Sequence, residues 1–498
     1  MDDATFIGHV KRFHTEKGLE EVVSLETLQQ GARLAKSREA LEKYYPELPS
    51  KIQKELDSEE GGQLRSLTKA LKVLLCTCAV GAIVQGWSQE SIVGANLDWP
   101  RDLNIVNVSD QYIGDGLRYF GIVNAMPYFA ASVLGAWVSD PITYVYGRRT
   151  ALFFAAICSL GAPIGSAYCQ TWYQLLACRL IQGVGMGAKA SVVPVIESEV
   201  LPPRLRGRLL YDKAYLGFLE LRATPLQAAR DLFMVYVNSH VETLLFSGKD
   251  VTTATLSRSL DKDMELQADS HSKFQELCFR VYEFFSNILG LFRNARNRRA
   301  VIASSVVMIA QQFSGINVFA FLATTVLNNS NKTSTLAMAL GFAASNAVFS
   351  PFAYFLIDRI GRRALLLTSL FSMLPFLLLT GRYLDVRNTG AAVTLIIIYT
   401  ALYSPGAGVI PFIYSSEIYP QQYREVGMSL AVAINLSFAG ALAIAVPQYQ
   451  KRLDDSAQHN QHLVLLGSFA ALDFVAAILV WLFMRYPEQR TVELEDMN

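Results

Sequence analysis

Ten apolar blocks, separated by short charged links, dominate this 498-residue sequence. Each block has about the twenty residues that an α-helix needs to cross the hydrocarbon core of a bilayer. None shows the alternating pattern of a membrane β-barrel strand. The sequence therefore predicts an all-α polytopic membrane protein. The candidate spans lie at about 71–93, 117–139, 150–170, 173–195, 301–327, 335–357, 364–381, 391–414, 427–447 and 463–484.

Composition agrees with a membrane protein and argues against several other classes. Hydrophobic residues make up 52% of the chain and charged residues 17%, whereas soluble domains carry about 25% charged residues. The net charge of +1 gives no indication of nucleic-acid binding. Residues 1–68 are polar and lack a signal-peptide-like apolar run, so we expect the first span to act as the insertion signal.

Basic residues near the span ends predict the orientation. Lys69 and Lys72 flank the start of the first span, and four arginines crowd the start of the 301–327 span, so both of these ends should be cytoplasmic. Glycosylation sequons at Asn107, Asn328 and Asn331 then fall on the outer face. We expect an integral protein, in the plasma membrane, with both termini in the cytoplasm.

The spans divide the chain into five segments. We expect a cytoplasmic N-terminal segment (1–68), a truncated N-terminal half of four helices (69–207), a cytoplasmic central segment (208–299), a C-terminal half of six helices (300–484) and a cytoplasmic tail (485–498). Stretches 25–44 and 225–246 have the periodicity of amphipathic helices. We interpret them as solvated helices that lie on the bundle rather than as catalytic elements.

The two halves contain an internal repeat. "SDPITYVYGRR" (139–149) resembles "IDRIGRR" (357–363), and "ESEVLPPRLRG" (197–207) resembles "SSEIYPQQYREVG" (415–427). The Asp and the Glu are 59 positions apart in each copy. The separation of the Asp from the Gly-Arg-Arg, however, differs by four residues between the copies. A parallel repeat of membrane helices explains this match. Two further spans follow the second copy and none follows the first, so we predict that two helices are missing there.

Several motifs in a fixed order resemble a known family. They are "RLIQGVGMGAKAS" and "PVIESEVLPPRLRG" in the fourth block, "QQFSGINVFAF" in the fifth, and then "IDRIGRR", "IPFIYSSEIYP" and "YPEQRTVELED". In these the chain resembles the sugar porter family of the major facilitator superfamily, in its fungal branch of sugar and polyol (myo-inositol-like) proton symporters. The resemblance implies two pseudo-repeated six-helix halves and alternating access. Here the halves would have 4 + 6 helices, without the equivalents of helices five and six.

Amide side chains are the candidate substrate ligands. Sugars present many hydroxyl groups, and amides both donate and accept hydrogen bonds. Gln312 and Asn317 are five positions apart, about 140° on a helix, so with Gln311 they can flank one wide face, while Gly315 permits a close approach. The resemblance implies that these three amides bind sugar hydroxyls. It assigns further site positions to Asn346, Phe412 and Asn435.

The alternative interpretation of the amides is structural, because buried amides also join helices in any membrane bundle. For Gln311, Gln312 and Asn317 we favour sugar contact. For Asn435 the two interpretations are equal.

Charged residues at the cytoplasmic helix ends form a second set. The resemblance implies that they build salt bridges that close a cytoplasmic gate; the alternative is that they are topological anchors, which explains the arginines but not the matched acids. The set consists of Asp140, Arg148, Arg149, Glu199 and Arg206 in the first half and Asp358, Arg362, Arg363, Glu417 and Arg424 in the second.

Proton coupling lacks its usual residue. In proton symporters of this family an Asp follows "QGW" in the first helix, whereas Ser88 stands there in this chain and a hydroxyl does not titrate near neutral pH. Glu90 is nearby but faces another side of a regular helix. Lys189 and Asp473 are ionisable residues inside apolar blocks, where a role in a transport pathway and simple helix packing are equally favoured.

These patterns together predict transmembrane transport of a sugar or polyol, ancestrally coupled to protons. The alternatives are a transport-inactive variant, produced by a gene-model or splice truncation, and a non-transporting sugar receptor. The chain has no phosphate loop, metal-ligand spacing or nucleophile elbow, so we expect no enzyme activity, cofactor or metal. The expected partners are a sugar or polyol, a proton as candidate co-substrate, and the lipid bilayer, with no nucleic acid.

Overall fold

The computed structural model describes 3–36 except 17–18, scattered positions between 41 and 106, 113–200, 219, 222, 224–246, 288–319 except 294, 332–419, 423–455 and 460–484. Within it the chain forms two compact units. We call Met1–Val80, Ile196–Gln275 and Glu488–Asn498 the polar unit, and Gly81–Val195 with Glu276–Pro487 the membrane unit. Each is described by itself.

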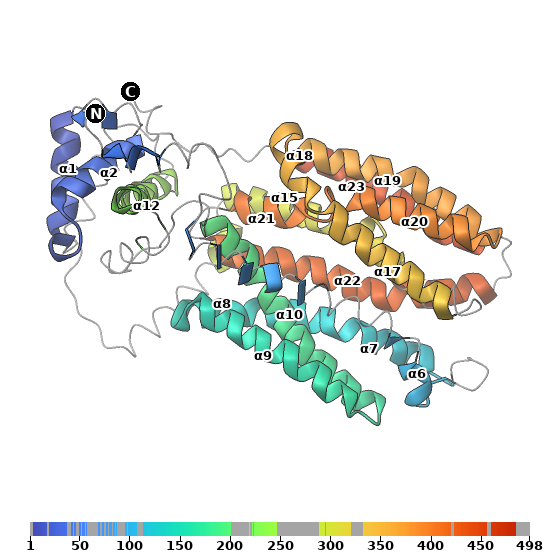
Figure 1. Ribbon diagram of the computed structural model, residues 1–498. Helices are drawn as coiled ribbons and strands as arrows, with labels where there is room; N and C mark the ends of the chain where they lie inside the picture. The colour runs from blue at the N-terminus through green and yellow to red at the C-terminus, as the bar shows by residue number, and fades with distance from the viewer. Residues whose placement is uncertain are drawn as a thin grey trace. The chain divides into compact units, whose positions relative to one another are not determined.

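The membrane unit is built from helices of two sequence halves (Figure 1). The first half contains α6 (Trp99–Asp102), α7 (Gly116–Ala130), the π-helical turn η3 (Ala131–Gly135), α8 (Ala136–Tyr146), α9 (Arg148–Ala167) and α10 (Trp172–Val200). The second contains α15 (Ala295–Phe313), α17 (Lys332–Phe349), α18 (Phe352–Ile360), α19 (Arg362–Asp385), α20 (Thr389–Tyr403), α21 (Ile410–Ile418), α22 (Arg424–Asp455) and α23 (Gln461–Phe483).

Seven helices among the described residues are long and apolar enough to cross a membrane. They are Gly116–Thr143, Arg149–Ala167, Ala295–Phe319, Leu340–Ile357, Arg362–Asp385, Arg424–Leu453 and Gln461–Phe483, and each overlaps a predicted span. The predicted 173–195 span falls within α10, and α20 is a shorter apolar helix inside the predicted 391–414 span. Most of the predicted 71–93 span lies outside the described residues.

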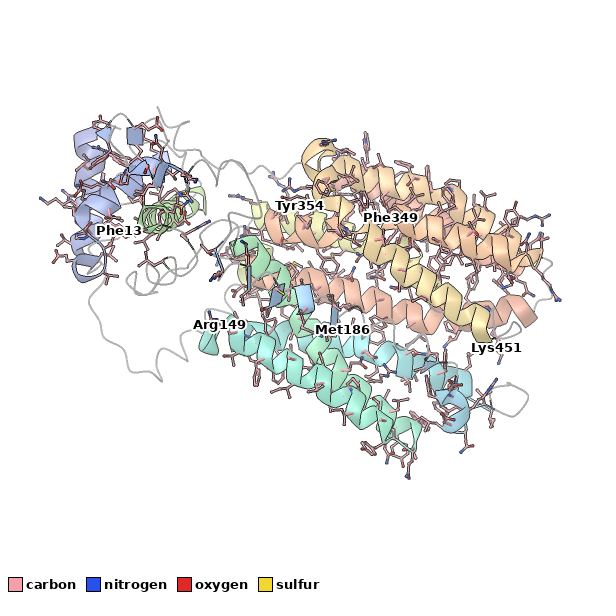
Figure 2. All side chains as sticks on the ribbon, viewed as in Figure 1. Phe13, Arg149, Met186, Phe349, Tyr354 and Lys451 are labelled. Atoms are coloured by element: carbon pink, nitrogen blue, oxygen red, sulfur yellow. The ribbon has the colours of Figure 1, made fainter. Side chains whose placement is uncertain are left out.

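Large apolar side chains cover the outer surface of these helices, as expected for a bundle surrounded by lipid. Phe153 and Leu160 on α9 and Leu340 on α17 are each about two-thirds exposed or more. Phe349 and Tyr354, labelled in Figure 2, are exposed at the end of α17 and in α18. Gln311 and Gln312 on α15 and Asn435 on α22, by contrast, are buried. Large apolar side chains thus face outward, and these amides face inward.

The two sequence copies share one backbone turn. Gly147 precedes α9 with φ +86° and ψ 165°, and Gly361 precedes α19 with φ +82° and ψ 152°. This region is essentially restricted to glycine, which explains why both copies read Gly-Arg-Arg. The four extra residues between Asp140 and Gly147 lengthen α8 by about one helical turn. The imperfect offset in the repeat therefore corresponds to a longer helix, and the shared glycine turn agrees with the predicted repeat.

Helix α22 joins the two halves of the membrane unit. It runs beside α7 (Figure 1), and a Cβ on Gly121 of α7 would lie 3.5 Å from the Cα of Ile444. The hydroxyl of Ser132, in η3, donates to the carbonyl of Ala433 at 2.7 Å and lies 2.6 Å from the hydroxyl of Ser437. Small residues permit this close approach, as is usual between membrane helices.

The polar unit has its own hydrophobic core. It brings together α1 (Asp3–Glu16), η1 (Leu19–Glu21) and α2 (Leu25–Lys36) with α12 (Pro225–Phe246) of the central segment (Figure 1). Phe13 and Leu28 are buried against Leu232 and Phe233, and a Cβ on Gly31 would lie 2.6 Å from the backbone nitrogen of Arg230. The two amphipathic stretches therefore bury their apolar faces against each other, a pairing that helical periodicity does not reveal.

Candidate substrate site

Four amide side chains form a continuous hydrogen-bonded chain between α15 and α22. Asn317 Nδ2 donates to Gln312 Oε1 at 2.6 Å, and Gln312 Nε2 donates to Asn435 Oδ1 at 3.1 Å. Asn435 Nδ2 donates in turn to Gln311 Oε1 at 2.8 Å. We call these residues the amide chain. The structure thus brings together four of the six predicted substrate ligands.

Backbone carbonyls anchor one end of the amide chain. Gln311 Nε2 donates to the carbonyls of Ala407 and Gly408, at 3.0 and 3.1 Å, in the segment between α20 and α21. That segment interrupts the predicted 391–414 helix, because Gly406 and Gly408 approach other backbone and side-chain atoms too closely to carry a Cβ. Gln311, Gln312 and Asn435 are buried, whereas Asn317 at the other end is partly exposed.

The helix that carries three of the amides is broken between them. Helix α15 ends at Phe313, and Gly315 has φ +84°, so the continuous helix predicted over 301–327 is interrupted here. The broken backbone keeps its polar groups satisfied: Tyr399 donates from its hydroxyl to the Ser314 carbonyl at 2.6 Å. Because of the break, Gln312 and Asn317 bond directly instead of lying about 140° apart on one helix.

The other two predicted substrate ligands, Asn346 and Phe412, do not take part in the hydrogen bonds of the amide chain. Asn346 Oδ1 on α17 accepts from the Ser404 hydroxyl at 2.8 Å and from the Ser350 hydroxyl at 3.2 Å. Phe412 on α21 packs on an apolar cluster that includes Met186, Met308 and Met428. Met186 lies on α10 (Figure 2), so this cluster joins the two sequence halves.

The apolar cluster directly adjoins the amide chain. Met308 lies slightly less than one helical turn before Gln311, and its carbonyl accepts from Asn435 Nδ2 at 2.9 Å. Met308, Met428 and Val432 are fully buried. The amides are therefore shielded on the side facing the start of α15 and of α22.

Two of the residues predicted for the gate form an ion pair within the second half. Arg362, at the start of α19, donates from Nη2 to Glu417 Oε1 at 2.8 Å, and its Nε lies 2.7 Å from Oε2. Arg363 instead donates to the Trp481 carbonyl near the end of α23 at 2.5 Å. Arg424, the first residue of α22, is buried.

The remaining predicted gate residues, from both halves, are only partly described. Arg149 at the start of α9 is exposed (Figure 2). Asp140, Arg148, Glu199 and Asp358 belong to helices, but their side chains lie outside the described residues, as do Arg206, Ser88 and Glu90 entirely.

A buried polar group in the first half was missed by the sequence reasoning. Arg179 on α10 donates from Nη1 to Gln182 Oε1 at 3.0 Å, and both side chains are buried. Asn124 on α7 is buried as well, and neither atom of its amide has a hydrogen-bond partner among the described residues. An arginine or an amide inside an apolar block is costly to bury unless it belongs to a binding site or pairs with another residue. The position of Arg179 and Asn124 in apolar blocks is therefore the sequence signal that could have identified them.

Comparison with known proteins places this chain in a family. The family model for sugar (and other) transporters matches residues 75–211 and 247–498, which is more than half of the chain. The protein therefore belongs to the sugar transporter family. Its relatives are membrane transporters and not enzymes, as the sequence predicted.

Several characterised relatives align over most of the chain. Myo-inositol transporter 1 of Saccharomyces cerevisiae is 25% identical, over 74% of this chain and 70% of its own length. Myo-inositol transporter 2 of Schizosaccharomyces pombe is 24% identical, over 89% and 84%. Polyol transporter 5 of Arabidopsis thaliana is 25% identical, over 84% and 85%.

Solved structures show the same fold. The proton:xylose symporter XylE bound to 6-bromo-6-deoxy-D-glucose superposes with a TM-score of 0.58 at 17% identity, over 86% of this chain and 98% of that one. The partially occluded inward-open form of XylE from E. coli gives a TM-score of 0.55 at 17% identity, over 85% and 100%. The membrane unit therefore has a major facilitator fold, as the sequence predicted.

Proposed function

We propose that this protein transports a sugar or polyol across a membrane by alternating access, with the amide chain as its substrate site. The observation that carries the proposal is the continuous hydrogen bonding of Gln311, Gln312, Asn317 and Asn435. A buried cluster of donors and acceptors suits a solute whose surface consists of hydroxyl groups. The myo-inositol and polyol transporters among its relatives support this substrate class.

Binding at this site exchanges one set of hydrogen bonds for another. The amides donate to and accept from one another, so they are not left as unpaired buried groups. A sugar hydroxyl that both donates and accepts replaces an amide partner without a net loss of bonds. A solute without hydroxyl groups cannot do so, and this difference gives the site its selectivity.

The gate follows from the ion pair between Arg362 and Glu417. The side chains are partly exposed at the ends of α19 and α21, so the pair can break and re-form at moderate cost as the helices move. The apolar cluster of Met308, Met428 and Met186 lies along α15 and α22. We infer that these two features close the cytoplasmic side and that the remaining gate residues, Asp140, Arg148, Arg149, Glu199, Arg206, Asp358, Arg363 and Arg424, join them there.

We further infer that the chain represents the fungal sugar and polyol branch with a 4 + 6 arrangement of helices. Between α10 and α15 the described residues contain one long helix, α12, which is not among the helices apolar enough to span a membrane. We place the protein in the plasma membrane with both termini in the cytoplasm, and we take its ancestral activity to be proton-coupled.

Uptake in transporter-deficient yeast tests the main proposal. Cells that express the chain should accumulate radiolabelled hexose or myo-inositol above empty vector, and Gln312→Ala should reduce that uptake more than an alanine at Asn346, which lies outside the amide chain. Surface expression of each variant is measured in parallel. Uptake equal to empty vector for the unmodified chain, at normal surface expression, would reject transport.

Two alternatives have their own outcomes. If the chain is a truncated gene product, sequencing the transcript across residues 208–211 will reveal additional coding sequence for two helices. A transcript junction that matches this chain contradicts the truncation. A receptor would bind radiolabelled sugar in isolated membranes without any flux.

A further inference from the structure

Asp473 is an isolated carboxylate in the centre of the membrane unit. It lies in the middle of α23, is fully buried, and neither of its carboxylate oxygens has a hydrogen-bond partner among the described residues. The structure and the family match assign it no role in substrate binding or in the gate. An ionisable residue at this depth marks a functional site more often than not.

The surroundings of Asp473 contain no counter-ion among the described residues. The helices packed on α23 are α15, α19 and α22, and their charged residues lie near their ends. Those residues are Arg296, Arg298 and Arg299 on α15, Arg362, Arg363, Arg382 and Asp385 on α19, and Arg424, Glu425, Lys451, Arg452, Asp454 and Asp455 on α22. At the depth of Asp473 the interacting titratable group is the hydroxyl of Tyr399 on α20.

A carboxylate in such a place holds a proton. An ionised carboxylate without a cation or a donor is far more costly to bury than a neutral carboxyl group. Tyr399 supplies no stabilisation, because its hydroxyl already donates to the Ser314 carbonyl. In this conformation Asp473 is therefore neutral, and it can lose its proton only if α23 or its neighbours move.

Packed side chains connect the helix break beside the amide chain with the surroundings of Asp473. Phe469, one helical turn before Asp473, packs on the break, because a Cβ on Gly315 would lie 3.3 Å from the Phe469 Cβ. Tyr399 contacts the break from the other side through Ser314. These contacts form a route by which a change at Ser314–Gly315 on sugar binding would reach Asp473.

We propose that Asp473 is a proton-binding site that is coupled to the substrate site through the break at Gly315. This inference rests on the proposed transport function. One proton adds to the carboxylate when the site faces one side of the membrane, and the same proton leaves when the site faces the other. Asp473 would then supply the titratable group that Ser88 does not provide.

Purified full-length protein in liposomes tests this proposal through two separate readouts. Counterflow of radiolabelled myo-inositol and glucose measures exchange of substrate, and a pH-sensitive dye measures proton movement when substrate is added. Asp473→Asn is a neutral isostere of the protonated carboxyl group. We expect it to retain counterflow and to lose substrate-induced proton movement entirely.

A matched control and a second variant keep the test decisive. Asp115→Asn makes the same chemical change at an exposed aspartate paired with Arg118, and it should retain both activities. If Asp473→Asn loses counterflow as well, the Asp473→Glu variant distinguishes the two outcomes. Substrate-induced proton movement in Asp473→Glu, with a shifted pH dependence, supports the proposal. No proton movement in Asp473→Glu overturns it.

The two proposals fail in different ways. Unmodified protein that shows no counterflow refutes the transport function and this inference with it. Counterflow without proton movement leaves the transport function standing and overturns the role of Asp473. Proton movement that persists at the unmodified level in Asp473→Asn likewise overturns it.

Discussion

Asn435 of α22 donates from its amide to the Gln311 oxygen of α15 across 2.8 Å. Two residues earlier on α22, the carbonyl of Ala433 accepts from Ser132 of the first sequence half. One helix thus contacts both the amide chain and the opposite half. A displacement between the halves would therefore reach the proposed substrate site through α22, as the proposed alternating access requires.

The first prediction concerns Asn435 itself. Asn435→Ala removes a partner from both Gln311 and Gln312, so it should weaken substrate binding by about 1 kcal/mol, seen as a roughly five-fold rise in KM for uptake. Ser437→Ala, on the same helix but outside the amide chain, is the control. Equal KM values for the two variants would show that Asn435 only joins helices.

The second prediction concerns the ion pair of Arg362 and Glu417. Either Arg362→Glu or Glu417→Arg places like charges together and should lower the uptake rate, whereas the double exchange restores part of it. Because both side chains are partly exposed, we expect a coupling energy of only about 1 kcal/mol in a double-mutant cycle. Additive effects would contradict a paired gate.

The third prediction uses the repeated glycine turn. Gly147→Ala and Gly361→Ala have space for a methyl group, but their positive φ angles make each substitution cost about 1–3 kcal/mol of unfolding free energy. Thermal unfolding in detergent should show a lower melting temperature for both variants. Gly161→Ala is the control, because Gly161 lies within α9 with ordinary φ and open space around it, and it should be neutral or slightly stabilising. Unchanged melting in the first two variants would disprove the shared turn.

The fourth prediction concerns Asp231 in the polar unit. This fully buried carboxylate is paired with Arg222 Nε at 2.5 Å and Arg230 Nε at 2.9 Å. Arg222→Met should lower the free energy of local opening by about 1–3 kcal/mol, because it leaves a buried oxygen unpaired. Hydrogen exchange of peptides from α12 in the full-length protein measures this opening.

The same variant has a defined pH dependence. Burial raises the pKa of Asp231, and the guanidinium groups of Arg230 and Arg222 counter the rise. Since the folded-state pKa lies above the ordinary value, stability from this carboxyl is present at low pH and lost as the pH rises through the folded pKa. Removing Arg222 raises that pKa further, so the defect should be greatest at neutral pH and shrink in mild acid. A defect that grows in acid would contradict the pairing.

The fifth prediction concerns two cysteines near the junction of α9 and α10. The sulfur atoms of Cys169 and Cys178 are 3.8 Å apart, so a small approach brings them to the roughly 2.05 Å of a disulfide. Mild oxidation of the purified protein should join them, as shown by mass spectrometry after thiol blocking. Cys169→Ser should abolish the product and Cys158→Ser should not. Full alkylation of both thiols after oxidation would contradict their proximity.

Much of the architecture could be read from the residues alone. Apolar length predicts spans because a bilayer has a fixed thickness, and seven described helices match such spans. The Gly-Arg-Arg repeat predicts a common element because only glycine tolerates the turn at Gly147 and Gly361. Gln311, Gln312 and Asn317 could be selected because amides both donate to and accept from hydroxyl groups and because their motif resembles that of the sugar porter family.

The partners of these residues were decided by the tertiary structure. The break at Gly315 brings Gln312 and Asn317 into direct contact, and no helical wheel predicts that geometry. The α15–α22 packing selects Asn435 over Asn346 as the fourth amide, since both occupy similar apolar surroundings in the sequence. Periodicity specifies which face of a helix is buried, whereas the identity of the neighbour depends on how separate helices are placed in space. For the same reason, only the folded chain shows that α12 shares a core with α1 and α2, and that Asp473 is buried without a described partner.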